Sequence, residues 1–302
     1  MDTDRAIVTY NLSKKYDGTD KYALKDLELD VNRGEVYGFL GPNGAGKSTT
    51  IRLLMNYILP TAGEAKIIGY DSVADTTLAK SYIGYLAGEL SLYSKMTGQE
   101  FLDYMLALQP PRHNSYYREL AKQFEAVLNQ KIGELSKGNR QKIGIIQAFM
   151  HEPDVLILDE PTSGLDPLMQ EVFFELVRRT KAKGASLFIS SHNLNEVQKM
   201  CDRVGFIKDG KLIVEQSIAD FAAKTTAQTY DISFAEQAPV SELRKIPRAK
   251  LKSNTAQHVT IQIRGSLSPL FRLLAKYKVN SLDRRALSLE EEFLQFYKRG
   301  KK

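Results

Sequence analysis

A glycine-rich run near the N-terminus has the residue types and the spacing of a phosphate-binding loop. It reads Gly41-Pro42-Asn43-Gly44-Ala45-Gly46-Lys47-Ser48-Thr49 and fits the pattern G-x-x-x-x-G-K-[ST]. Glycines lack a Cβ, so backbone N–H groups can close around a polyphosphate. Lys47 adds a positive charge near the β and γ phosphates, and Ser48 can place its hydroxyl on Mg²⁺. The run therefore predicts a nucleotide site, and a chance glycine-rich turn is the less favoured alternative.

The flanking residues predict the elements that would position this loop. Residues 35–40 are short and apolar, which indicates a buried strand, and residues 48 to about 58 carry apolar side chains at helical spacing. A helix that starts at the loop presents the positive end of its dipole to an anion. Strand, glycine-rich turn and helix together are the context in which this motif binds phosphate.

Two carboxylates follow another buried strand. Residues 155–158 are continuously apolar and precede Asp159 and Glu160, a pattern typical of a strand covered on both faces in a parallel sheet. Asp159 is expected to hold Mg²⁺, directly or through water. Glu160 is placed to activate the attacking water as a general base. Acids after a strand also serve as helix caps or solvated loop residues, but the phosphate loop makes us reject that alternative.

The rest of the first 220 residues predicts an α/β core with a helical insertion. Asp209-Gly210, between two apolar runs, predicts a hairpin. Residues 91 to 130 have helical periodicity, with Pro110-Pro111 separating two segments. Further strands are predicted at residues 6–12, 24–31, 65–69, 81–86 and 185–190, and further helices at residues 143–150 and 168–182.

Composition excludes several classes of protein. The chain has 302 residues, 43% hydrophobic and 26% charged, which is ordinary for a soluble protein of two domains. No run approaches the roughly 18 apolar residues of a membrane span, and residues 1–10 lack a signal-peptide core. The single cysteine, Cys201, excludes an internal disulfide and fits a reducing cytoplasm. A packed or surface cysteine is favoured over a reactive thiol.

Positive charge is concentrated at the C-terminal end. Residues 221–302 hold 16 of the 42 Lys and Arg but only 7 of the 36 Asp and Glu. Such a surface can meet anionic lipid headgroups, nucleic acid or an acidic partner, or it can simply keep the chain soluble. Residues 230–234 and 258–263 alternate as strands do, residues 268–277 are helical in pattern, and Ser288 opens a capping box with Glu291. We expect a small α+β domain at residues 221–302.

Three further motifs give the chain a resemblance to ABC ATPases. The run Leu135-Ser136-Lys137-Gly138-Asn139-Arg140-Gln141-Lys142 resembles their LSGGQ signature, with Lys third and Asn fifth. Residues 161–166, PTSGLD, match the D-loop, and His192 matches the switch histidine. The resemblance covers residues 1 to about 220. It implies a P-loop NTPase cassette, that is, a RecA-like core with an antiparallel β edge and a helical subdomain at about residues 91–150, followed by the accessory domain at 221–302.

The resemblance also implies roles for single residues. His192 would sense the γ-phosphate, and Tyr16 would stack on adenine, although Tyr22 is near and either ring could be a packing residue. Ser136 and Gly138 would bind the γ-phosphate of ATP held by the other protomer, and Ser136 would cap its helix as well. The implied ligands are ATP and Mg²⁺. ATP-binding residues would be Tyr16, the loop Gly41, Pro42, Asn43, Gly44, Ala45, Gly46, Lys47, Ser48 and Thr49, and Ser136 and Gly138; the catalytic residues would be Glu160 and His192.

One position departs from the family pattern. Relatives usually carry Gln after the strand that here spans residues 83–86, and Gly88 holds that place. The neighbouring Glu89 can substitute as a contact of Mg²⁺ or water, or it is only a loop acid. The implied metal contacts are therefore Ser48, Asp159 and Glu89.

Within the family, the Gly88-Glu89 loop, residues 135–142 and residues 289–294 resemble the ATPase subunits of type-2 exporters. Such subunits form homodimers, or pair with another ATPase subunit, beneath separate transmembrane permease subunits, which implies a cytoplasmic protein peripheral on the inner face of the membrane. Two protomers would close on two ATP molecules and reopen after hydrolysis. Candidate contacts of the permease, or ordinary packing residues, are Leu90, Leu92, Tyr93 and Met96.

Two other functions compete with export. A soluble ABC ATPase acting on ribosomes or nucleic acid would suit the basic C-terminal part, but such proteins usually carry two cassettes or a long coiled coil, so no nucleic acid is expected here. A catalytically dead cassette would act as a scaffold. The presence of Lys47, Asp159, Glu160 and His192 argues against that alternative.

Overall fold

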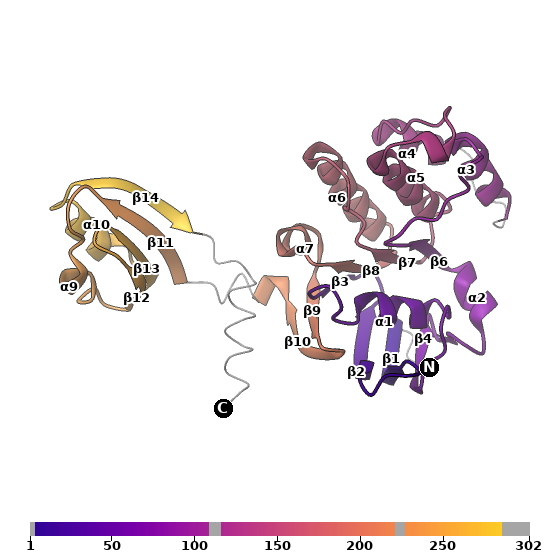
Figure 1. The fold of residues 1–302 in the computed structure, drawn as a ribbon, viewed down its shortest axis with the longest axis horizontal. Helices are drawn as coiled ribbons and strands as arrows, with labels where there is room; N and C mark the ends of the chain where they lie inside the picture. Colours follow the sequence, from indigo (N-terminus) through magenta and orange to yellow (C-terminus); the bar gives the residue numbers. More distant parts are fainter. Residues whose placement is uncertain (1–3, 109–115, 221–226, 286–302) are drawn as a thin grey trace. The chain divides into compact units, whose positions relative to one another are not determined.

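The computed structural model describes residues 4–108, 116–220 and 227–285 (Figure 1). The chain divides into two compact units, Met1–Gln216 and Ser217–Lys302. Across the described ranges, no helix has both the length and the apolar character that crossing a membrane requires. The capping box expected at Ser288 and the helix after it lie outside the described residues.

A six-stranded sheet in the order β10-β9-β3-β8-β7-β6 forms the centre of the first unit. Strands β9, β3, β8, β7 and β6 are parallel neighbours. Every residue of β3, β7 and β8 is buried, as the continuous apolar runs predicted. The strands are β3 Val36–Leu40, β6 Ile83–Leu86, β7 Val155–Asp159, β8 Ser186–Ser191, β9 Arg203–Lys208 and β10 Lys211–Ser217.

The hairpin expected between β9 and β10 is confirmed. Asp209 and Gly210 both have positive φ, 48° and 74°, which is the conformation that a two-residue hairpin turn of this kind requires.

A second, antiparallel sheet in the order β2-β1-β4-β5 forms the predicted β edge. Its strands are β1 Arg5–Lys15, β2 Tyr22–Asn32, β4 Ala62–Ile67 and β5 Tyr70–Asp71. Ile7 and Leu27 of this sheet belong to one buried cluster with Phe39 and Phe188 of the central sheet and with Ile51 of the first helix. The two sheets therefore share a single apolar core.

Helices cover the central sheet, and α3, α4 and α5 gather at one side of it (Figure 1). Ser136 caps α5, Asp166 caps α6, and Thr97 with Glu100 forms a capping box on α3. The helices of this unit are α1 Lys47–Leu54, α2 Thr76–Ser81, α3 Gly98–Ala107, α4 Tyr116–Gln123, the 3₁₀ turn η1 Ile132–Glu134, α5 Lys137–Phe149, α6 Pro167–Ala182 and α7 Leu194–Met200.

Several predicted helix bounds were wrong. Helix α1 ends at Leu54 rather than near Ile58, because Asn56 takes the left-handed conformation with φ 49°. Residues 91–96 are not helical, and α5 begins at Lys137 instead of Ile143. Helix α2 was not expected, and it takes Ser81 from the predicted strand.

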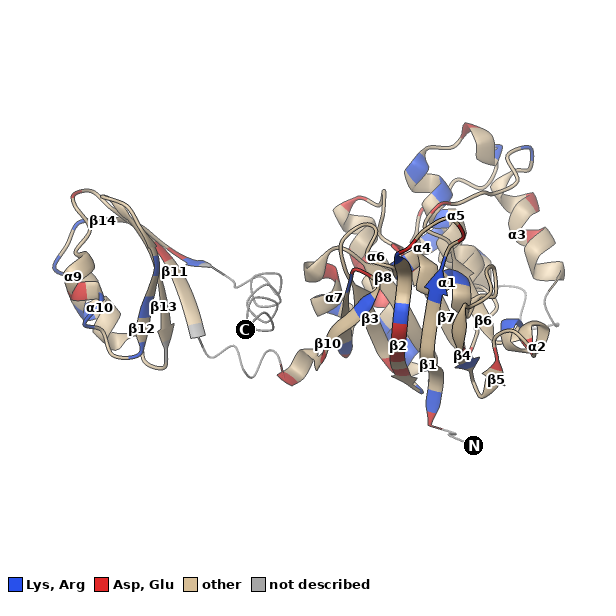
Figure 2. Cartoon of the chain, turned by 60° about the horizontal axis from the view of Figure 1, so that its bottom comes forward, with Lys and Arg blue, Asp and Glu red and all other residues tan. Residues whose placement is uncertain are grey.

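The second unit is a small α+β domain, as its strand and helix patterns indicated. Its elements are β11 Ala227–Phe234, α9 Val240–Leu243, β12 Ala249–Asn254, β13 His258–Arg264, α10 Ser268–Leu274 and β14 Val279–Arg285. The antiparallel order β12-β13-β11-β14 makes this a split βαβ fold. Ile232, Ile261 and Leu270 lie in its apolar core. The other sheet face is polar, with Thr260 donating to Asp231 at 2.6 Å. Figure 2 shows Lys and Arg on the strands as well as on the helices of this unit.

Candidate functional site

Three parallel strands bring the phosphate loop, the two carboxylates and His192 to one edge of the central sheet. Strand β3 pairs with β8 so that Leu40 lies opposite Ser191, and β7 pairs with β8 so that Asp159 lies opposite Ser190. The phosphate loop follows β3, the two carboxylates end β7, and His192 follows β8. Because all three strands run in the same direction, these segments meet at their carboxyl ends (Figure 1).

The phosphate loop has backbone geometry that depends on glycine. Gly44 and Gly46 have φ of 79° and 113°. A Cβ on Gly41 would lie 2.4 Å from the carbonyl oxygen of Ile207, so only glycine fits there. Gly46 precedes α1, and no side chain caps the helix. The N–H groups of the first turn can therefore donate hydrogen bonds to an anion.

Lys47 and His192 hold the two carboxylate oxygens of Glu160. The Lys47 ammonium is buried and donates to the carbonyl oxygens of Gly41 and Pro42 at 2.7 and 3.3 Å. It lies 3.4 Å from Glu160 Oε1, while His192 Nδ1 lies 2.9 Å from Glu160 Oε2. Glu160 has φ 48°, so the backbone turns directly after β7.

Ser48 and Asp159 present oxygen atoms that fit Mg²⁺. The Ser48 hydroxyl donates to Asp159 Oδ2 at 3.0 Å, and the Ser190 hydroxyl donates to Oδ1 of the same carboxylate. Within the described residues there is no group of three or more His, Cys, Asp or Glu that would form a protein-only cage. A site with few protein ligands is suitable for Mg²⁺, because this ion keeps several waters and takes phosphate oxygens as its other ligands. Ser190 was not predicted as a site residue, although the parallel strand ends place it beside Asp159.

A cavity of about 530 Å³ opens beside this pair. A Cβ on Gly88 would lie 3.0 Å from Asp159 Oδ2, so the position at which the family resemblance leads us to expect Gln directly adjoins the carboxylate. Exposed Glu89 lines the same cavity. Tyr57 and Tyr85 also line this cavity and were not predicted from the sequence, and their rings lie 5.5 Å apart. Burial, with Tyr57 and Asp159 nearby, raises the pKa of Tyr85 to about 12, so its phenol keeps its proton. The lining residues are Ser48, Arg52, Tyr57, Tyr85, Ala87, Gly88, Glu89, Lys137, Asp159, Glu160 and Ser163.

The signature segment packs against the D-loop of its own protomer. Ser136 is exposed and caps α5 by accepting from the N–H of Asn139. A Cβ on Gly138 would lie 2.8 Å from the carbonyl oxygen of Gly164. Asn139, which differs from the fifth residue of the LSGGQ pattern, is buried and forms two hydrogen bonds with the backbone of Val127, at 2.9 and 3.0 Å. The departure at this position therefore has a structural use.

The two tyrosines considered for adenine stacking both remain open to solvent. Tyr16 is 37% and Tyr22 is 41% exposed, so neither belongs to the core. A Cβ on Gly46 would lie 2.8 Å from the carbonyl oxygen of Ala23, which places the start of β2 beside the phosphate loop. Both rings have a lysine ammonium above them, from Lys14 and Lys25.

The four candidate permease contacts differ in exposure. A Cβ on Gly144 would meet Leu90 at 2.9 Å, so Leu90 packs on α5. Leu92 and Met96 are half-buried. Tyr93 is 56% exposed, and its ring lies 5.9 Å from that of Tyr104. Tyr93 is therefore the candidate that offers an open aromatic surface.

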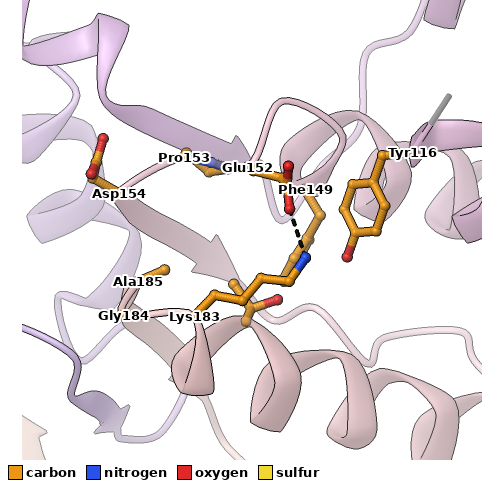
Figure 3. Close-up of a pocket in the computed structure, with 9 residues that line it drawn as sticks. Tyr116, Phe149, Glu152, Pro153, Asp154, Lys183, Gly184 and Ala185 are labelled. Carbon is orange, nitrogen blue, oxygen red and sulfur yellow. Dashed lines mark hydrogen bonds and ion pairs between the residues drawn. The ribbon is translucent and has the colours of Figure 1, made fainter. Parts of the chain in front are cut away.

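A second cavity, of about 300 Å³, lies at the opposite ends of β7 and β8, next to Asp154 and Ala185 (Figure 3). Its charged Lys183 pairs with Glu152 at 2.6 Å and lies 4.8 Å from the centre of the Tyr116 ring. Lys183 is thus paired within the same chain. The cavity lies beside the starts of β7 and β8, so none of the residues that line it belongs to the site at the carboxyl ends of these strands.

Comparison with known proteins agrees with this geometry. The profile of the ABC transporter family matches residues 24–163. The ABC transporter ATP-binding protein NatA of Bacillus subtilis is 37% identical over 197 residues, covering 63% of this chain and 80% of NatA. The bacitracin transport ATP-binding protein BcrA of Bacillus licheniformis is 30% identical over 294 residues, 96% of this chain and 95% of BcrA. The chain belongs to the ATP-binding proteins of the ABC transporter family.

Coverage differs among the relatives. The probable multidrug ABC transporter ATP-binding protein YbhF of Escherichia coli is 32% identical over 240 residues, and the match spans 78% of this chain but only 41% of YbhF. A solved ATP-binding subunit of an ABC transporter superposes with a TM-score of 0.67 at 30% identity, over 72% of this chain and 92% of that subunit. The dimeric bacterial cassette MJ0796 superposes with a TM-score of 0.64 at 25% identity, over 70% of this chain and 98% of that cassette.

Cys201 is expected to be unreactive while the chain is folded. It is buried at the end of α7, and burial raises the pKa of its thiol far above the usual range, so the nucleophilic thiolate is scarce. Ellman's reagent at pH 8 should label the native chain slowly and should label one thiol per chain in guanidinium. Rapid labelling of the native chain would show that the thiol is open.

Proposed function

We propose that this chain is the ATP-binding and ATP-hydrolysing subunit of an ABC exporter. Two copies, or one copy and a paired ATPase subunit, work in the cytoplasm beneath separate membrane permease subunits. The observation that carries the proposal is Glu160 held between Lys47 and His192, next to the Ser48–Asp159 pair. The family membership and the transport names of NatA and BcrA support it.

Each residue of the site has a task in hydrolysis. The uncapped N–H groups of α1 and the Lys47 ammonium bind the β and γ phosphates of ATP. When bound, Mg²⁺ neutralises phosphate charge, with Ser48 and Asp159 as its protein ligands. Glu160 takes a proton from water as the water oxygen bonds to the γ-phosphorus. The bond from that phosphorus to the bridging oxygen breaks, giving ADP and phosphate. His192 contacts Glu160 and orients it toward the water.

A second copy completes the site in this proposal. Ser136 is exposed at the N-terminus of α5, where it can face the γ-phosphate bound by another protomer. Such an arrangement makes ATP bind the closed dimer more tightly than the open one, and the difference in affinity drives closure. The dimeric cassette MJ0796 supports a dimer for this chain.

Lys47→Ala should lower kcat for ATP by at least about 100-fold, because one ammonium contacts both the loop carbonyls and Glu160. Phosphate release at saturating Mg²⁺ and ATP measures the loss. Lys122→Ala, an exposed lysine on α4, serves as the control and should keep the parental rate. Parental turnover by Lys47→Ala would contradict the assignment of the phosphate loop.

Glu160→Gln should bind ATP, lose about 100-fold or more in kcat and accumulate as a closed dimer, because it keeps the size of the side chain and loses the base. Size-exclusion chromatography with light scattering, with and without ATP, measures the dimer. Hydrolysis at the parental rate by this variant would show that Glu160 is not the base.

A photo-crosslinking amino acid at Tyr93 should capture an integral membrane protein in the cells that make this chain, because Tyr93 is the most exposed of the four candidate contacts. The same amino acid at exposed Tyr10 on β1 is the control and should not capture it. ATPase activity that rises with ribosomes or nucleic acid, without such an adduct, would instead favour the soluble ABC ATPase.

A further inference from the structure

One buried carboxylate joins the two loops that carry the catalytic pair. Glu196, in the first turn of α7, is only 8% exposed. Its Oε2 accepts hydrogen bonds from the Thr162 hydroxyl at 2.7 Å and from the Ser191 hydroxyl at 3.2 Å. Its Oε1 accepts from Asn193 Nδ2 at 3.1 Å. A buried carboxylate is stable only where such donors satisfy it, so these contacts fix its position.

The three donors lie directly beside Glu160 and His192 in the sequence. Thr162 is two residues after Glu160, and Ser191 and Asn193 stand on either side of His192. Thr162 and Ser191 are themselves 6% and 3% exposed. The N–H of Asn193 also donates to the Ser191 hydroxyl at 2.9 Å, which closes the turn that contains His192. Glu196 therefore links the loop after β7 to the loop after β8.

The side chains of the catalytic pair are less constrained than this buried cluster. His192 has 60% of its side chain exposed and Glu160 has 26%. Entropy favours free rotation of an exposed histidine side chain, so the ring is ordered only where the backbones of both loops bring it within reach of Glu160. The 2.9 Å contact between His192 and Glu160 thus depends on the relative position of the two loops.

We propose that Glu196 is a positioning residue that sets the distance between Glu160 and His192 by holding the loop that carries each of them. The inference rests on the proposed ATPase function for its kinetic consequence. Its structural consequence, the placement of His192, does not depend on turnover.

Glu196→Gln keeps the volume of the side chain and replaces an acceptor oxygen by an NH₂ donor, so the three donors can no longer all donate to this side chain. We expect kcat to fall by about 10- to 100-fold, since small misplacements of catalytic groups have effects of that size. KM for ATP should stay within about twofold, because the phosphate loop is untouched. Glu171→Gln on α6, an exposed acid paired with Lys199, is the matched control and should keep the parental kcat.

Combining variants separates positioning from general destabilisation. In a His192→Ala background, Glu196→Gln should lower kcat by less than about twofold further, because the Glu160–His192 contact whose geometry it sets is already gone. If the two losses multiply in full, Glu196 does not act through His192, and the proposal is wrong. Thr162→Val removes one of the donors to Glu196 and should also lower kcat. If Glu196→Gln does not fold, this variant tests the proposal in its place, and a parental kcat would contradict it.

Histidine-selective NMR of the full chain tests placement without turnover. The ring signal of His192, identified by its loss in His192→Ala, should move in Glu196→Gln, while that of His258 in the second unit should not. An unchanged His192 signal would overturn the proposal. If the parental chain hydrolyses no ATP, the proposed function fails, and the NMR comparison still decides whether Glu196 positions His192.

Discussion

The parallel pairing of β3, β8 and β7 is the constraint on which the site depends. It aligns Leu40 with Ser191 and Asp159 with Ser190, so three loops distant in sequence begin at one sheet edge. Hydrogen bonds across these loops then complete the arrangement, from Ser190 to Asp159 and from Ser48 to Asp159. Each contact is modest by itself. The site is specific because strands buried along their whole length cannot shift register without exposing apolar residues.

Charge within the site is balanced rather than simply positive. The Lys47 ammonium lies between the carbonyl oxygens of the phosphate loop and the carboxylate of Glu160. In the proposed mechanism, one cation thus serves both the bound phosphate and the carboxylate that activates water. Asp159 is shared in the same way, because one of its oxygens accepts from Ser48 on α1 and the other from Ser190 on β8. Groups with shared partners are coupled, so their contributions to catalysis will not add.

Local motifs were predictable where backbone geometry follows from residue type. The phosphate loop, the Asp209-Gly210 hairpin and the buried strand before Asp159 needed only short-range patterns. Features that depend on distant partners were not predictable. Asn139 turns inward to the backbone of Val127, and Gly88 adjoins Asp159, because of contacts that no local pattern contains. Helix α2 is short and mostly exposed, so its periodicity is weak. The end of α1 depends on Asn56 taking a left-handed conformation.

The packing around the only sulfhydryl has a practical consequence. Cys201 is enclosed where a Cβ on Gly38 would lie 3.0 Å from its sulfur. Dyes or spin labels introduced at engineered surface cysteines would therefore attach only at the chosen positions, without first deleting the native residue. Movements of the signature segment or of the C-terminal unit can be followed by fluorescence or electron resonance in a chain that is otherwise unaltered.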